Sequence, residues 1–186
     1  MGKVIAIAGQ IASGKTTLAK FLETRGFERI VTYTTRPKRE GEIDDVDYYF
    51  LSADEFEGRS KRGFFAEETS YEAKFGFVRY GTSKASLETP DGAKKAIVLN
   101  PTGVMTLKDA GYDIFVVYLD TPQEVLMRRA LRRGDSPSEI GRRIADDARI
   151  FRRFENSAIS GDYINLRVES GELLPNQIAD WIQSTL

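Results

Sequence analysis

Three short apolar runs stand out along the chain, at residues 3–9, 94–100 and 113–120. Runs of this length predict strands that are buried on both faces, as in a parallel sheet. None approaches the length of about 20 apolar residues that a membrane-spanning helix needs. The pattern therefore predicts neither a membrane span nor a secretory leader.

Amphipathic helices are predicted between and after these strands. They cover residues 15–24, 122–134, 137–154 and 175–186. The third carries its apolar residues at helical spacing, at Ile140, Ile144, Phe151 and Phe154. An N-cap, a proline and a capping-box acid precede two of the helices, as Thr121, Pro122 and Glu124 and as Ser136, Pro137 and Glu139. Strands that alternate with helices predict an α/β fold, a parallel sheet with helices on both faces.

A second group of elements is predicted between residues 29 and 83. Ser52 and Glu55 fit a capping box that begins a short helix to about Arg62, which Gly63 ends. Strands are expected at 29–35, 47–52, 63–71 and 74–83, the last two as a pair or long hairpin, and a final strand at 163–168.

The amino-acid composition excludes several classes of catalytic and metal-binding site. The 186 residues contain no cysteine and no histidine, which excludes disulfides, zinc fingers, cysteine nucleophiles, Ser-His-Asp triads and histidine metal sites. A net charge of −1 gives no support for nucleic-acid binding. Nine arginines nevertheless lie between Arg128 and Arg153, either as a solvated helix face or as a phosphate clamp. We expect a cytoplasmic protein with no membrane partner.

Residues 9–17 read GQIASGKTT, between a predicted strand and a predicted helix. This is the Gly-x-x-x-x-Gly-Lys-Thr pattern of a phosphate-binding loop, and its structural context is met. Lys15 is expected to reach the β- and γ-phosphates of a nucleotide, and Thr16 to hold Mg²⁺. The predicted phosphate-loop residues are Gly9, Gln10, Ile11, Ala12, Ser13, Gly14, Lys15, Thr16 and Thr17, and the family resemblance described next implies that the nucleotide is ATP.

Residues 32–57 closely resemble the acceptor-binding segment of guanylate kinases. The positions that match are Thr34, Thr35, Arg36, Arg39, Gly41, Glu42, Asp47, Tyr48 and Phe50. FFAEETS, RYGTSKASLE and RRALRRGDSPSEIGRRI resemble further family segments in the same order, so that the resemblance spans nearly the whole chain. It implies a P-loop type sheet with a small α+β acceptor-binding excursion and a helical lid.

The same resemblance implies which residues bind GMP. A monophosphate needs paired cations and hydroxyl donors, and the family pattern places these at Arg36, Arg39, Tyr48 and Tyr80. Glu67 matches the glutamate that accepts hydrogen bonds from guanine, while strand alternation leaves Glu68 solvated. The other matching positions are Thr32 near the acceptor phosphate and Thr82 near the base.

Two features depart from the family pattern. Val98 and Asn100 stand where the family usually has acidic residues, so that Asn100 offers guanine only a carbonyl oxygen. Asn100 before Pro101 is also a good N-cap for the next helix. The segment between Glu67 and Tyr80 is longer than usual by about four residues. Both departures bear on strict GMP preference and leave phosphoryl transfer intact.

The catalytic residues implied are Lys15, Arg133 and Arg143, with Arg132 and Arg142 as alternatives for the two lid arginines. Phosphoryl transfer needs alignment and charge neutralisation, so no general base is required. We expect a single guanylate-kinase-like domain. It comprises a core of residues 1–31, 91–121 and 155–186, an acceptor-binding subdomain of 32–90 and a lid of 122–154.

The leading hypothesis is the ATP-dependent phosphorylation of GMP, and of dGMP, to GDP products by a monomer or homodimer. A related kinase with another nucleoside monophosphate or a ribose bisphosphate as acceptor is the first alternative. A guanylate-kinase-like binding module without catalysis is the second. Such modules usually have a degraded phosphate loop, whereas Lys15 and Thr16 are intact here.

Overall fold

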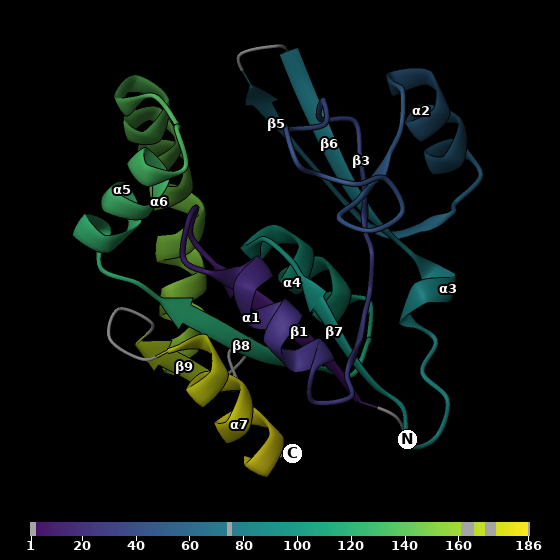
Figure 1. Cartoon of the computed structure of the whole chain (residues 1–186). Coiled ribbons are helices and arrows are strands. Elements are labelled where there is room, and N and C mark those ends of the chain that lie inside the picture. Colours follow the sequence, from purple (N-terminus) through teal and green to yellow (C-terminus); the bar gives the residue numbers. More distant parts are fainter. Residues whose placement is uncertain (1–2, 74–75, 161–165, 170–173, 186) are drawn as a thin grey trace.

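A five-stranded parallel sheet forms the centre of the computed structural model, which describes residues 3–73, 76–160, 166–169 and 174–185 (Figure 1). The strand order is β2-β7-β1-β8-β9. The strands are β1 (Lys3–Gly9), β2 (Glu28–Arg29), β7 (Lys94–Val98), β8 (Ile114–Asp120) and β9 (Leu166–Glu169). The predicted α/β fold with a parallel sheet is confirmed. Residues 163–165 of the predicted last strand lie outside the described residues.

Helices cover both faces of this sheet, because successive side chains of β1 point to opposite sides. Val4, Ala6 and Ala8 share a core cluster with residues of α4 and α6, while Ile5 and Ile7 share the other with α1 and α7. These helices are α1 (Lys15–Glu23), α4 (Pro101–Asp109), α6 (Pro137–Ser160) and α7 (Pro175–Thr185). Burial on both faces fixes β1 and so fixes the start of the loop that follows it.

A smaller sheet of order β4-β3-β6-β5 carries the second group of elements (Figure 1). Phe56 and Phe65 stack with ring centroids 4.5 Å apart and pack α2 on this sheet. A Cβ at Gly81 would lie 2.8 Å from the Phe65 ring, so only glycine leaves room for this packing. The elements are β3 (Tyr33–Thr34), β4 (Tyr49–Phe50), α2 (Ala53–Lys61), β5 (Phe65–Ala73), β6 (Gly76–Ser83) and α3 (Lys84–Leu87). The predicted hairpin is confirmed as antiparallel β5 and β6.

The prediction of one strand over residues 29–35 is wrong. The segment instead contributes β2 to the central sheet and β3 to the small sheet. The Ile30 amide donates to the carbonyl oxygen of Ala96 at 2.8 Å, and Ile30 is buried in the main core. Thr34 is fully buried on the other side of the crossing. Ile30 and Thr34 are thus buried at different sheets, which divides a segment that looks like one strand in sequence.

Of the predicted helix caps, the one at Ser52 is confirmed and the one at Thr121 is wrong. The Ser52 capping box forms, and its hydroxyl accepts from the Glu55 amide at 3.2 Å. The predicted Thr121 cap does not form, since α5 (Gln123–Arg132) begins one residue later and has Pro122 at its N-cap. Thr121 itself is buried directly after the last residue of β8. Among the residues described, no helix is long and apolar enough to cross a bilayer.

Candidate active site

A cavity of about 1060 Å³ lies where the loop after β1, the small sheet and helices α5 and α6 meet. Most of the predicted site residues line it. From the phosphate loop these are Gly9, Ile11, Ala12, Gly14, Lys15, Thr16 and Thr17. From the remaining predictions they are Thr32, Arg36, Arg39, Tyr48, Glu67, Tyr80, Asn100, Arg133 and Arg143. Gln10, Ser13 and Thr82 are not among the lining residues.

Glycines shape the phosphate loop. A Cβ at Gly9 would lie 2.5 Å from the Ser13 hydroxyl oxygen and 3.0 Å from the Leu119 carbonyl oxygen, so the loop can approach β8 only without a side chain there. Gly14 has φ of +102° and stands at the N-cap of α1 with no side-chain cap. The first amides of α1 therefore stay uncovered by any capping side chain, which suits an anion at the positive end of the helix.

Lys15 lies within this loop. Its Nζ donates to the carbonyl oxygens of Gly9 and Gln10, both at 2.8 Å. These are two neutral acceptors, so the ammonium charge is not cancelled by a carboxylate in those two contacts. A phosphate that enters the loop offers stronger, charged acceptors within reach of the same group.

Thr16 is the residue predicted to bind the metal, and it is exposed to the cavity. Within the described residues no group of three or more acidic or histidine side chains could hold a metal by itself. A single hydroxyl fits Mg²⁺, which keeps several waters and is otherwise bound by substrate phosphates. The donor set thus agrees with a metal that arrives together with a nucleotide.

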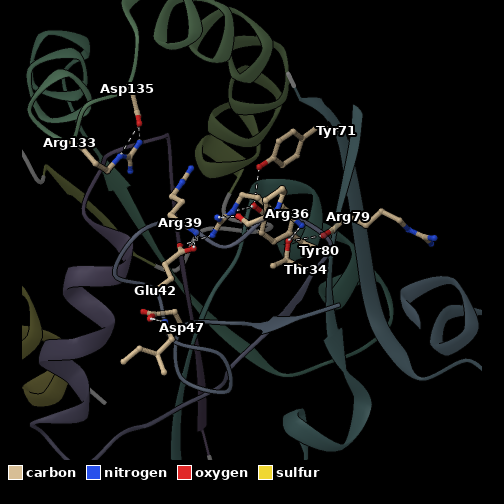
Figure 2. A network of polar contacts seen from close by, with 12 residues as sticks. Thr34, Arg36, Arg39, Glu42, Asp47, Tyr71, Arg79, Tyr80, Arg133 and Asp135 are labelled. Atoms are coloured by element: carbon tan, nitrogen blue, oxygen red, sulfur yellow. Dashed lines mark hydrogen bonds and ion pairs between the residues drawn. The ribbon is translucent and has the colours of Figure 1, made fainter. Parts of the chain in front are cut away.

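Arg36 is held in place by the small sheet and the loop after β3 (Figure 2). Its guanidinium donates to the Glu42 carboxylate at 2.6 Å, to the Tyr80 hydroxyl at 3.1 Å and to the Pro37 carbonyl oxygen at 2.7 Å. Burial raises the pKa of Glu42, but hydrogen bonds from Arg36 and from the Arg39 amide outweigh it and lower that pKa. Glu42 is therefore an ionised anchor that orients Arg36.

Arg39 and Tyr48 complete this cationic corner. The Arg39 amide donates to Glu42 at 2.8 Å, whereas its side chain makes no hydrogen bond to the residues that the structure describes. The Arg36 guanidinium lies 5.4 Å from the centroid of the Tyr48 ring. Burial, and then the neighbouring Tyr80, raises the pKa of Tyr48, so that its hydroxyl keeps its proton. The corner therefore offers cations and phenol donors to an anion.

Glu67 is the buried acid of the cavity, with 4% of its surface exposed. It accepts a hydrogen bond from the Thr82 hydroxyl at 2.6 Å. Burial raises the pKa of Glu67 to about 7, and the bond from Thr82 offsets only a fraction of that effect. A Cβ at Gly103 would lie 3.0 Å from the Glu67 carboxylate, so glycine allows α4 to approach it closely. Thr82 thus donates a hydrogen bond to Glu67 but is not itself a lining residue of the cavity.

Asn100 is the N-cap of α4, as its place before Pro101 predicts. Its side-chain oxygen accepts from the Gly103 amide at 2.7 Å, and its side-chain nitrogen donates to the Thr69 hydroxyl at 2.9 Å. The oxygen and the nitrogen of the Asn100 side chain are therefore both hydrogen-bonded within the protein. Among the carboxylates that line the cavity, Glu67 is the buried one.

The lid arginines do not all face the cavity. Arg133 lines it and pairs with Asp135, while Arg143 and Arg142 line it from α6. Arg132, the alternative to Arg133, is exposed and does not line the cavity. Arg133 is therefore the better placed of the two to reach a ligand in the cavity. Sequence reasoning missed Arg129, whose guanidinium donates to the Ser13 carbonyl oxygen at 3.1 Å. Its place four residues before Arg133, on the same helix face, was the available signal.

The β5–β6 hairpin contributes lining residues that were also not predicted. They are Glu68, Thr69, Ser70, Tyr71 and Glu72. The prediction that Glu68 is solvated is wrong, because it is half-buried and pairs with Arg79 at 2.8 Å. The hairpin register supplies the reason, since Glu68 stands opposite Gly81 and can reach Arg79 on the neighbouring strand.

A phosphate loop on a parallel sheet, with a cationic corner lining the same cavity, is the arrangement of a P-loop kinase. Within that class, the chain belongs to the guanylate kinase family, whose family model matches residues 1–162. It is 35% identical over 151 residues to the guanylate kinase of Symbiobacterium thermophilum, covering 78% of this chain and 70% of that one. It is 30% identical over 171 residues to that of Lactiplantibacillus plantarum, covering 87% and 81%.

Solved structures show the same fold. The guanylate kinase from Anaplasma phagocytophilum superposes with a TM-score of 0.72 at 22% identity, covering 99% of this chain and 84% of that one. Shikimate kinase from Acinetobacter baumannii gives a TM-score of 0.53 at 15% identity, covering 98% and 92%. The fold is therefore that of P-loop kinases.

Proposed function

We propose that the protein transfers the γ-phosphoryl group of ATP to GMP, with dGMP as a second acceptor. The observation that carries this proposal is one shared cavity. It joins the phosphate loop, the cationic corner of Arg36 and Arg39, and the buried carboxylate of Glu67. The relatives reported above, which are guanylate kinases, support the same assignment.

The acceptor site follows from complementary chemistry. Guanine presents N1–H and N2–H₂ as adjacent donors, and ionised Glu67 can accept both. The monophosphate then reaches Arg36, Arg39, Tyr48 and Tyr80, whose cations and phenols match its charge and oxygens. Glu42 keeps Arg36 oriented before the acceptor binds. In this arrangement the acceptor phosphate faces the phosphate loop.

At the donor end, Lys15 leaves the loop carbonyls and neutralises the β- and γ-phosphates of ATP. Mg²⁺, held by Thr16 and the phosphates, would supply further charge neutralisation and orientation. Arg143 and Arg133 serve the transferred group, and for Arg133 this requires release from Asp135. Arg129 fixes the loop through Ser13. No proton acceptor is needed beyond the phosphates themselves.

The proposed division of the chain assigns a separate task to each segment. Residues 1–31, 91–121 and 155–186 form the core, 32–90 bind the acceptor and 122–154 form the lid. Closure of the acceptor-binding segment and the lid over the core would exclude water, which otherwise competes as an acceptor of the phosphoryl group. Arg142 of α6 donates to the Glu72 carbonyl oxygen of the hairpin, and such closure would use contacts of this kind.

A second candidate is a kinase of the same mechanism with another nucleoside monophosphate or a ribose bisphosphate as acceptor. The contacts of Asn100 favour it, because they engage the residue that stands in place of a family acid. The cationic corner would hold the phosphate of either acceptor. Buried Glu67 argues against a sugar, which offers no pair of adjacent N–H donors.

An ADP-release assay with Mg²⁺-ATP tests these alternatives. The acceptors are GMP, dGMP, AMP, CMP, UMP, dTMP and ribose 1,5-bisphosphate, and the Lys15→Ala variant controls for contaminating kinases. We expect turnover with GMP and dGMP above all others. Preference for another acceptor would replace GMP while keeping the kinase assignment. ATP binding without turnover on any acceptor would favour the binding-module alternative.

A further inference from the structure

Tyr71 lies on the segment of the β5–β6 hairpin that is longer than the family pattern. Its ring stacks on Tyr80, with centroids 5.6 Å apart and planes inclined by 15°. Figure 2 shows Tyr71 directed toward Tyr80 and Arg36, and it lines the same cavity as they do. A third tyrosine, Tyr48, meets Tyr80 edge to face at 5.8 Å. The longer hairpin thus adds an aromatic group to the cationic corner.

The hydroxyl contacts give Tyr71 a particular task. The Tyr71 hydroxyl donates to the Tyr80 oxygen at 3.1 Å, and Arg36 Nε donates to the same oxygen, also at 3.1 Å. A phenol hydroxyl can both accept and donate hydrogen bonds. Tyr80 accepts in both of these contacts, so its own proton is left to donate. Since all three groups line the cavity, an anion there is the natural acceptor.

Tyr71 also touches the lid. The guanidinium carbon of Arg143 lies 5.8 Å from the centroid of the Tyr71 ring, within the range of a cation–π contact. Beside it, Arg142 donates to the Glu72 carbonyl oxygen at 3.2 Å. The hairpin therefore contacts α6 through two successive residues. The Tyr71 hydroxyl thus contacts Tyr80 in the cationic corner, and the Tyr71 ring contacts Arg143, which the proposed function assigns to the transferred phosphoryl group.

We propose that Tyr71 is a positioning residue that presents the Tyr80 proton to the acceptor phosphate and holds Arg143 over the reaction. This inference rests on the proposed function, because it gives an acceptor monophosphate as the anion. The two contacts use different atoms of the side chain. The hydroxyl acts on acceptor binding, and the ring acts on the lid arginine. Substitutions can separate them.

The Tyr71→Phe variant removes the hydroxyl and keeps the ring. We expect the KM for GMP to rise by about threefold to tenfold, the loss typical of one hydrogen bond, with kcat and the KM for ATP nearly unchanged. Tyr71→Leu removes the ring as well, and kcat should then also fall, by roughly fivefold. Tyr49→Phe is the matched control, since Tyr49 lies in the same sheet but outside the cavity. It should match the wild type in all three constants.

Calorimetric binding of GMP makes the test independent of turnover. The ratio of the Kd values of Tyr71→Phe and wild type should equal the ratio of their KM values. Wild-type constants in Tyr71→Phe, or an equal loss in Tyr71→Phe and Tyr71→Leu, would overturn the role of Tyr71 while leaving the proposed function intact. GMP binding without turnover in the wild type would contradict the proposed function and the role of the Tyr71 ring, while the role of the Tyr71 hydroxyl would still be decided by the ratio of the Kd values. No GMP binding at all would overturn both.

Discussion

At the scale of single residues, the cavity contains a lysine and a glutamate in different surroundings. Lys15 is half-buried among backbone carbonyls, and Glu67 is almost fully buried beside a threonine. The phosphate loop could be predicted from the sequence because its residues are contiguous and its backbone shape needs specific glycines. For Arg129 the sequence offered only its place on the helix face of Arg133, because the rotation of α5 decides which arginine of a dense cluster faces the cavity.

Replacing Lys15 tests the donor end. Lys15→Ala should lower kcat by about three orders of magnitude, because it removes the cation at the β- and γ-phosphates. The melting temperature should stay close to that of the wild type, since the Lys15 hydrogen bonds to Gly9 and Gln10 join it to backbone carbonyls of its own loop. Steady-state kinetics and thermal unfolding measure the two effects. Near-normal turnover would refute the phosphate-loop assignment.

Replacing Glu67 tests the recognition of guanine. Glu67→Gln should raise the KM for GMP roughly 10- to 100-fold and leave the KM for ATP nearly unchanged, because an amide NH₂ then faces a guanine donor. Glu88→Gln is the matched control, an exposed glutamate of the same subdomain outside the cavity. Equal changes in the two KM values would mean that Glu67 has only a structural role.

The raised pKa of Glu67 also predicts a pH dependence. Only the ionised carboxylate accepts both guanine donors, so kcat/KM for GMP should rise with pH through about 7 and then level off. The neighbouring Glu68 carboxylate adds to the shift. The free energy of unfolding of the free protein should change with pH in the opposite direction. The raised pKa favours the folded state while Glu67 is protonated, and this stability is lost as pH rises from about 4.5 through about 7. Both dependences should flatten in Glu67→Gln, which kinetics and denaturant unfolding between about pH 5 and 8 can measure.

At the scale of elements, helix caps and the hairpin decide the shape of the acceptor side. The capping box at Ser52 and the cap at Asn100 were predictable, because each needs only residues within one turn. The division of residues 29–35 between two sheets was not, because it depends on which sheet buries each side chain, as with Ile30 and Thr34. The role of Tyr71 depends on hairpin register, which a bulge between Phe65 and Glu67 shifts.

The Asn100 cap gives a prediction at this scale. Asn100→Ala should destabilise the protein by about 1 kcal/mol, because the Gly103 amide loses its acceptor. Asn100→Asp should keep the cap and return an acid to the cavity, so that discrimination of GMP from AMP should increase. Chemical denaturation and acceptor competition assays measure these effects. Equal stability of Asn100→Ala and wild type, or unchanged selectivity in Asn100→Asp, would contradict this account.

At the scale of the whole molecule, the cavity lies among the core, the small sheet and the helices α5 and α6, which different segments of the chain build. The absence of cysteine makes their movement measurable, since two introduced cysteines can be labelled uniquely. Spin labels at Asp54→Cys on α2 and Arg128→Cys on α5 should move closer when GMP and a non-hydrolysable ATP analogue bind together, and less with either alone. Labels at Lys20→Cys and Asp180→Cys, on α1 and α7, should keep their distance. An unchanged first distance would rule out closure of the acceptor-binding segment and the lid.

The crossing between the two sheets has one more consequence. The chain leaves the central sheet after β2 and returns to it at β7, and these two strands are hydrogen-bonded neighbours. The whole acceptor-binding segment is thus a cassette inserted between adjacent strands, with its entry and exit side by side. On the proposed division, most of the acceptor-binding residues can then be exchanged as one unit, by recombination or by design, with Asn100 after β7 exchanged separately, while the phosphate loop and its helix stay as they are.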